Sequence, residues 1–160
     1  MNNKYKLTEE TKVVDGITLY RIQALKDIPE CNVKAGDLGG WIEKESNLSH
    51  EGNAWVFGDA KIFGDTEVSG NTWVFGDAKV YGNAMIFGNA RVFGNARVFG
   101  DAWVFGDAKV YGNAHVYEDA RIYDNAWVFG DTAVSGNAWV SGNARIFGDA
   151  QVSGNAIIYN

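Results

Sequence analysis

Residues 88–114 read GNARVFGNARVFGDAWVFGDAKVYGNA, and this stretch decides the fold. A six-residue unit recurs in it: glycine, Asn or Asp, alanine, a variable residue, Val or Ile, and then an aromatic residue. The unit continues without insertion or deletion from residue 52 to residue 159, which makes 18 hexapeptides. A period this strict predicts a solenoid, in which each repeat stacks on its neighbours.

The alternation of side chains along a strand predicts which residues face inward. If the third and fifth positions of the unit point one way, the fourth and sixth point the other. The fourth position carries eight charged residues, which a narrow core cannot hold: Lys61, Glu67, Lys79, Arg91, Arg97, Lys109, Arg121 and Arg145. We therefore expect Ala and Val or Ile inside and the aromatic residues outside.

A short strand and a tight corner, repeated, predict a triangular prism. Three hexapeptides close one coil of 18 residues, so the repeats make about six coils. Glycine followed by Asn or Asp forms each corner, because these residues tolerate the left-handed backbone of a sharp bend. The fold class is therefore all-β, with parallel strands stacked along the prism.

The repeat resembles the hexapeptide-repeat proteins that form left-handed parallel β-helices. Their motif places a small residue four positions after an aliphatic one, as in Val56 to Ala60, Ile62 to Thr66 and Val104 to Ala108. The resemblance covers about two thirds of the chain and implies the left-handed sense of the coil. The chain departs from the family where an aromatic residue follows the aliphatic one, in 14 of 18 units.

Residues 1–51 are not repetitive and are expected to form a hairpin and a cap, followed by a repeat domain at 52–160. Residues 13–20, VVDGITLY, predict a β-hairpin with an Asp-Gly turn. Leu38, Trp41, Ile42 and Leu48 are expected to cover the first coil, whose backbone edge would otherwise stay unpaired. The stretch GDLGGWIEKESNLS also resembles the leader of hexapeptide-repeat proteins from bacteriophages and prophages, which implies a phage origin.

Composition excludes several classes of protein. The net charge of −6 argues against general nucleic-acid binding. No apolar run approaches the roughly 18 residues of a membrane span, and the polar N-terminus does not resemble a signal peptide. A single cysteine, Cys31, allows no internal disulfide. We therefore expect a cytoplasmic protein, in an infected bacterium if it is phage-encoded.

Residues 18 apart share a face of the prism, and the face that begins with Trp55 (face 1) is the most aromatic. An apolar surface of this size indicates an interface, although stacked aromatics that only shield the strands are the alternative. The resemblance implies a homo-oligomer, a trimer first and a dimer next. The predicted interface residues are Trp55, Phe57, Trp73, Phe75, Phe93, Tyr111, Trp127, Phe129 and Phe147.

Faces 2 and 3, which begin with Lys61 and Glu67, carry further cations beside aromatic residues. Arg91 and Lys109 of face 1 and Arg121 of face 3 lie in the same two coils as Arg97 and His115 of face 2. Cations next to aromatic rings suit an anionic planar ligand such as a nucleotide, while an ordinary solvated charged surface is the alternative. The predicted ligand-binding residues are Arg91, Arg97, Phe99, Lys109, His115, Tyr117 and Arg121.

No catalytic constellation stands out, so we expect a non-enzymatic binding protein. It would bind a host protein or sequester an anionic signal of host defence, with no metal and no cofactor. Two histidines, His50 and His115, cannot build a three-histidine zinc site within one chain. The resemblance implies an alternative, a coenzyme A-dependent acyltransferase with a histidine base, and His115 is the outward candidate. A structural virion component is the third hypothesis.

Overall fold

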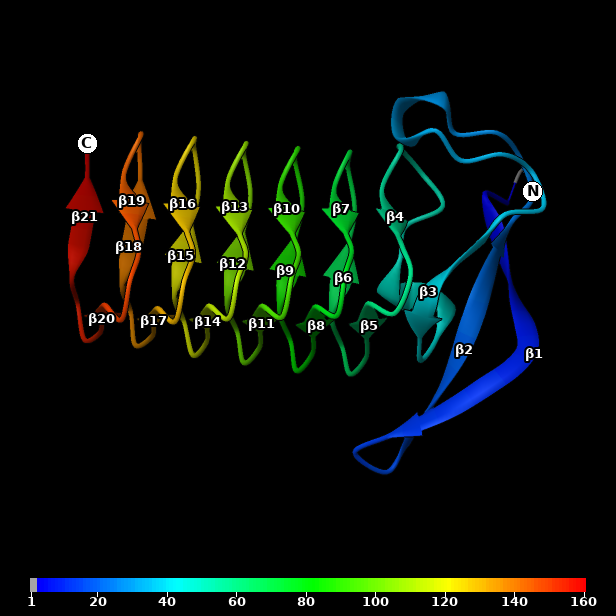
Figure 1. Cartoon of the computed structure of the whole chain (residues 1–160), viewed down its shortest axis with the longest axis horizontal. Coiled ribbons are helices and arrows are strands. Elements are labelled where there is room, and N and C mark those ends of the chain that lie inside the picture. Colours follow the sequence, from blue (N-terminus) through cyan, green and yellow to red (C-terminus); the bar gives the residue numbers. More distant parts are fainter. Residues whose placement is uncertain (1–2) are drawn as a thin grey trace.

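The computed structural model describes residues 3–160 and shows an all-β parallel solenoid of about seven turns. The turns stack along one axis from the leader to the last strand (Figure 1). The predicted fold class, coil length and parallel stacking are confirmed. The left-handed sense of the coil stays a prediction. No helix in residues 3–160 is long and apolar enough to cross a membrane.

Three sheets form the sides of the prism, and each corresponds to one predicted face. The face-1 sheet contains β4 (Trp55–Val56), β7 (Trp73–Val74), β10 (Arg91–Val92), β13 (Lys109–Val110), β16 (Trp127–Val128) and β19 (Arg145–Ile146). The face-2 sheet contains β1 (Tyr5–Val14), β2 (Ile17–Ala24), β3 (Leu38–Ile42), β5 (Lys61–Ile62), β8 (Lys79–Val80), β11 (Arg97–Val98), β14 (His115–Val116), β17 (Ala133–Val134) and β20 (Gln151–Val152). The face-3 sheet contains β6 (Glu67–Val68), β9 (Met85–Ile86), β12 (Trp103–Val104), β15 (Arg121–Ile122), β18 (Trp139–Ser141) and β21 (Ile157–Tyr159).

Neighbouring turns pair in strict 18-residue register. Arg91 of β10 pairs with Trp73 on one side and Lys109 on the other, and the Arg91 N–H donates to the carbonyl of Ala108 at 3.0 Å. The backbone donors of a short strand therefore find their acceptors in the neighbouring turns. This register places side chains 18 residues apart directly beside each other.

The core is a column of small and branched aliphatic side chains. The alanines of the third position and the Val or Ile of the fifth are fully buried through most of the prism, as Ala96 and Val98 show. The predicted inward and outward assignment is confirmed, because the fourth and sixth positions are partly or fully exposed in the middle turns. Val98 thus lies inside while its neighbour Arg97 faces water.

The corners differ in detail from the prediction. The glycine alone takes the left-handed backbone, with φ near +70° in most turns, and the Asn or Asp after it does not. A Cβ on Gly88 would lie 2.9 Å from the backbone nitrogen of Gly106, so the turns approach too closely for a side chain there. Where glycine is replaced, Glu118 and Asp124 adopt φ values of 58° and 56° themselves.

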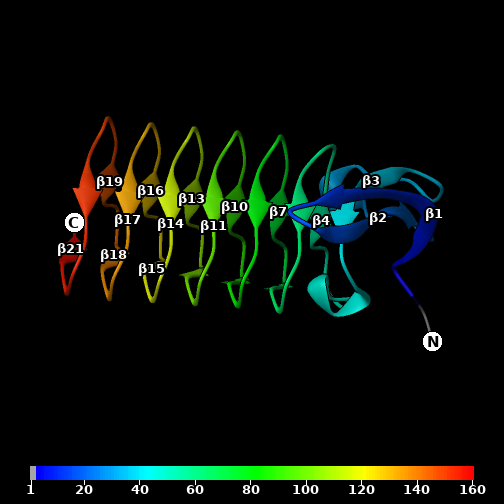
Figure 2. The same ribbon diagram turned by 90° about the horizontal axis from the view of Figure 1, so that it is seen from below.

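The predicted N-terminal hairpin is confirmed. β1 and β2 pair in antiparallel fashion around Asp15 and Gly16, both of which have positive φ, as the turn of a two-residue hairpin requires. Figure 2 shows the hairpin reaching back along the solenoid over its first turns. Leu19 of the hairpin is buried in a cluster with Trp41 and Phe63.

The leader supplies a turn of the solenoid as well as a cap. Strand β3 pairs in parallel with β5, and Leu48 forms a parallel bridge to Val68, so the prism has about seven turns where the repeats alone predict six. Trp41, Ile42 and Leu48 are buried as expected. Leu38, the first residue of β3, is 48% exposed and covers little of the core, so this part of the prediction is wrong.

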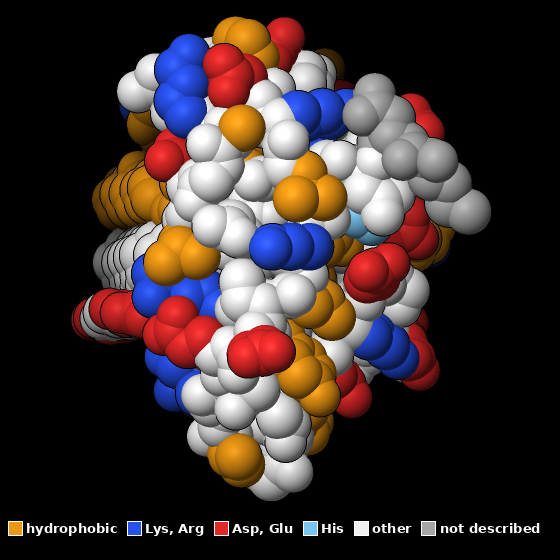
Figure 3. Space-filling model, turned by 90° about the vertical axis from the view of Figure 1, so that its right-hand side faces the viewer, with side chains coloured by type: hydrophobic (Ala, Val, Ile, Leu, Met, Phe, Trp, Pro, Cys, Tyr) orange, Lys and Arg blue, Asp and Glu red, His pale blue; other side chains and the backbone are white. Residues whose placement is uncertain are grey.

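The N-terminal end of the prism is closed by residues of β1 and two short 3-10 helices, η1 (Pro29–Cys31) and η2 (Glu45–Asn47). The ammonium of Lys4, fully buried, donates to the carbonyl of Ala54 at 2.8 Å. The hydroxyl of Tyr5 lies 2.7 Å from the carbonyl of Leu48 and donates to it. Viewed from this end, the leader presents a mixed surface of charged, polar and apolar side chains (Figure 3).

Candidate functional site

The structure distributes the seven predicted ligand-binding residues over all three faces. Arg91 and Lys109 are neighbours on the face-1 sheet, and Arg97 and His115 are neighbours on the face-2 sheet, which also bears Phe99 and Tyr117 at the ends of its strands. Arg121 lies on the face-3 sheet, between Trp103 and Trp139. The prediction that these residues share one site remains untested, but no single small ligand can contact three sides of a prism.

The aromatic residues of the sixth position stack on one another along each face. Phe75 and Phe93 are parallel, with ring centroids 4.6 Å apart, and Phe99 and Tyr117 are parallel at 5.0 Å. Because each ring lies against the next turn's ring, the stacked faces are occupied within the chain. These ladders therefore shield the strands and leave mainly ring edges for a ligand.

Each tryptophan of the fourth position except Trp55 has a cation of a neighbouring turn over its ring, namely Trp73, Trp103, Trp127 and Trp139. Lys109 Nζ lies 4.5 Å from the Trp127 ring centroid, and the Arg145 guanidinium carbon lies 4.6 Å from it on the next strand. On face 3, Arg121 lies 4.8 Å from the Trp103 ring. Such cation–π contacts explain why the repeat sets cations beside tryptophans.

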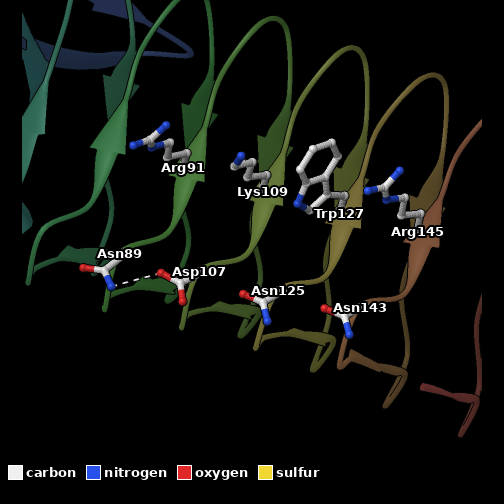
Figure 4. A pocket seen from close by; sticks show the side chains of 8 residues that line it. All are labelled: Asn89, Arg91, Asp107, Lys109, Asn125, Trp127, Asn143 and Arg145. Atoms are coloured by element: carbon white, nitrogen blue, oxygen red, sulfur yellow. Dashed lines mark hydrogen bonds between the residues drawn. The ribbon is translucent and has the colours of Figure 1, made fainter. Parts of the chain in front are cut away.

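A groove runs along face 1 between the fourth-position side chains and the corner column of second-position residues. It encloses about 420 Å³. One wall carries Arg91, Lys109, Trp127 and Arg145, which stand in register on β10, β13, β16 and β19 (Figure 4). The other wall carries Asn89, Asp107, Asn125 and Asn143. Neighbouring residues along either wall are about 4.8 Å apart, the spacing of strands.

Hydrogen bonds along the corner wall stop inside the groove. The amide of Asn71 donates to Asn89 at 3.1 Å, and the amide of Asn89 donates to the Asp107 carboxylate at 3.0 Å. Asp107 cannot donate onward, and no side-chain hydrogen bond joins Asn125 or Asn143 to a residue in the described part of the chain. The groove therefore offers two amide groups whose donors are available to a ligand.

The cations of the groove have no acidic partner within 4.0 Å among residues 3–160. The ion pairs of the described residues all include a residue of the leader. Lys12 pairs with Asp59, for example, at 3.6 Å, and Lys44 pairs with Asp65 at 2.7 Å. Arg91 and Arg145 are exposed and Lys109 is half-buried. The groove thus places three cations beside the one carboxylate of Asp107, a net positive charge on a protein whose total net charge is −6.

The leader closes one end of the groove. Glu30 of η1 lines a hollow together with Asn71, Trp73 and Arg91 that continues into the groove. On the other side of Trp73, Cys31 lines an apolar hollow of about 340 Å³ with Phe57 and Phe75. The groove is therefore bounded toward the N-terminus and continues along the prism in the other direction.

His115, the outward histidine of the repeats, lies on the face-2 sheet away from this groove. Burial, and next the nearby Arg97 guanidinium, lower the pKa of the His115 imidazole. Its ring meets Phe99 edge-on, with centroids 6.5 Å apart. Both effects favour the neutral imidazole.

The predicted interface residues remain partly accessible with one exception. Trp55 is 1% exposed, because Tyr5 of the leader packs against its ring at 6.4 Å in an edge-on geometry. Trp55 therefore cannot contribute to an interface between copies, and that part of the prediction is wrong. Phe147, by contrast, is 61% exposed.

Comparison with known proteins agrees with the architecture. Residues 78–92, 90–106 and 120–136 match a family model described as the YdcK β-solenoid repeat. Over 62 residues, the chain is 39% identical to an Escherichia coli (strain K12) protein described as the uncharacterized acetyltransferase YdcK. The chain fits the hexapeptide-repeat β-helix superfamily. The match takes in 34% of this chain and 18% of the relative, so the chain spans less than a fifth of that protein.

Within this hexapeptide-repeat architecture, sequence reasoning missed the corner wall of the groove. The corner prediction explains Asn89, Asp107, Asn125 and Asn143 only as corner formers, and the predicted ligand-binding residues do not include Arg145. The signal was present in the sequence, because the second and fourth positions both recur every 18 residues. Reading these two columns together would have placed the amides beside the cations.

Proposed function

We propose that the protein is a non-enzymatic binding protein that holds an anionic ligand in the face-1 groove. The observation that carries the proposal is the row of Arg91, Lys109 and Arg145 without acidic partners within the described chain, facing the available amides of Asn125 and Asn143. Anions accept charge-assisted hydrogen bonds from guanidinium and ammonium groups such as these. A nucleotide would be held here through its phosphates, because the Trp127 ring is already covered by Lys109 and Arg145.

Titration calorimetry with ADP, inorganic polyphosphate and oligogalacturonates tests this proposal. We expect binding of at least one of these anions that weakens as salt is raised. The double variant Lys109→Ala and Arg145→Ala should remove this binding. The double variant Lys61→Ala and Lys79→Ala, which deletes two cations of face 2, should leave it unchanged. Equal loss in both variants would show that the anions respond to net charge alone.

The second candidate function is acetyl transfer, favoured by the description of the Escherichia coli relative. His115 would serve as the base, because its lowered pKa keeps the imidazole unprotonated. Consumption of acetyl-coenzyme A by the wild type, lost in His115→Ala but kept in His50→Ala, would favour this function over simple binding.

We also propose that the chain forms a closed homo-oligomer, a trimer first and a dimer next. The support is the aromatic ladder of face 1 from Phe75 to Phe147, which is half-buried as far as Phe129 and exposed at Phe147. This ladder lies on the opposite side of the fourth-position column from the groove, so assembly leaves the groove open. Light scattering coupled to size exclusion should give the mass of a trimer or a dimer of the 17.5 kDa chain. A monodisperse monomer would show that the ladder only shields the strands.

A further inference from the structure

The face-1 groove is linear, and its chemistry repeats once per turn. Arg91, Lys109 and Arg145 occupy three of four consecutive positions in strict register. The register fixes these positive groups in a line parallel to the solenoid axis (Figure 4). Such an array is better matched by an extended chain of anions than by one compact anion, which could contact two turns at most.

The groove does not offer a surface for bases. The ring of Trp127 has a cation of the turn before and of the turn after within 4.6 Å of its centroid. The nearest ladder rings, Phe93 and Tyr111, stack on each other at 4.7 Å. A single-stranded nucleic acid, which depends on stacking with open aromatic faces, is therefore disfavoured as the extended ligand.

Asp107 distinguishes between the remaining polyanions. Its carboxylate stands in the corner wall of the groove, between Asn89 and Asn125, and one oxygen accepts the Asn89 amide. The other oxygen faces no donor of the described chain. A chain of phosphates would meet repulsion there, whereas a hydroxyl group would donate to this oxygen. The groove thus suits a ligand that carries both carboxylates and hydroxyls.

We propose that the groove binds a linear acidic polysaccharide with one carboxylate on each sugar ring. Its carboxylates would pair with Arg91, Lys109 and Arg145, and its hydroxyls would bond to Asp107 and to the amides of Asn125 and Asn143. A sugar ring is about as long as the distance between neighbouring strands, so one ring matches one turn. This inference rests on the proposed anion binding and names the class of ligand.

Calorimetry of the full chain with galacturonate oligomers of increasing length tests the proposal. Affinity should rise from the monomer to the tetramer and change little beyond it, because the row of charged positions spans four turns. Arg145→Gln should weaken tetramer binding about tenfold or more, the effect of losing one charged hydrogen bond. Lys79→Gln, which removes one cation of face 2, is the matched control, and neutral dextran should not bind.

The direction in which Asp107→Leu changes the affinity for galacturonate decides whether the carboxylate contributes to binding. If the carboxylate accepts sugar hydroxyls, this variant should bind galacturonate about tenfold more weakly, with circular dichroism reporting an intact fold. Stronger binding of galacturonate to Asp107→Leu would overturn the proposal. Binding of ADP or inorganic polyphosphate that Arg145→Gln weakens, without binding of galacturonate, would overturn the polysaccharide and keep the anion-binding function. Binding of none of these probes would overturn both.

Discussion

Trp55 and Trp127 occupy the same position of the repeat on the same face, and their surroundings differ. Trp55 is 1% exposed beneath Tyr5 of the leader, whereas Trp127 is half-buried between two cations and lines the groove. Face 2 shows the same contrast, since Phe63 is buried with Leu19 of the hairpin while Phe99 is only half-buried. The repeat therefore decides which side chains face outward, and the leader decides which of these are accessible.

The largest expected effect concerns the buried aliphatic column, which runs through both the turns covered by the leader and the uncovered turns. Val98→Asp places an unpaired carboxylate in the fully buried column, at a cost above about 4 kcal/mol, and should unfold or aggregate the protein. Arg97→Asp, one residue away and exposed, should change the melting temperature little. Thermal melts that show two equally mild variants would contradict the inward and outward assignment.

A smaller effect is expected where the leader meets face 2. Leu19 is fully buried against Trp41 and Phe63, so Leu19→Ala should cost about 2–5 kcal/mol of packing locally. Hydrogen exchange should then rise in β1 and β2 and in the neighbouring turns β5 and β8. Exchange in β14 and β17 should stay as in the wild type. A uniform rise along the prism would mean that the leader and the repeats unfold as one unit.

The buried Lys4 at the N-terminal end of the prism should make the stability of the protein depend on pH. Burial lowers the pKa of Lys4 to about 8, from 10.5. Between these two values the unfolded chain binds more protons than the folded chain, so stability should rise with pH, by up to about 3 kcal/mol.

The control for this effect is Lys4→Met, measured over the same pH range by chemical denaturation. Burial raises the pKa of Tyr5, so both proteins lose stability above pH 10. Because this loss is common to both, the difference between the two stability curves reports Lys4 alone. Parallel curves for the two proteins would show that the ammonium of Lys4 is not desolvated in the folded state.

The smallest effect concerns the corners. Gly58 and Gly88 both have positive φ, but a Cβ on Gly58 meets nothing within 4 Å, whereas one on Gly88 meets Gly106 at 2.9 Å. Gly58→Ala should cost about 1–2 kcal/mol of backbone strain, and Gly88→Ala should cost more, because two turns must separate. Equal losses in denaturant melts would show that conformation alone, rather than close approach, selects glycine.

The sequence by itself determined the core, the three faces and the length of the coil. A strict period of six places Val98 and every equivalent residue inside, because charged side chains at the fourth position cannot be buried in a narrow prism. The hairpin around Asp15 and Gly16 was equally readable, since turn chemistry is local. The columns of aromatics and cations also followed directly from the spacing of 18.

Only the tertiary structure decided what those columns do. The burial of Trp55 and the half-exposure of Leu38 depend on how the non-repetitive leader packs, which no local pattern specifies. The predicted ligand residues fall on three sides of the prism, whereas Arg91, Lys109 and Arg145 come together with corner amides in one groove. Contacts between turns arise from atoms far apart in the chain, so their consequences appear only once the coil has closed.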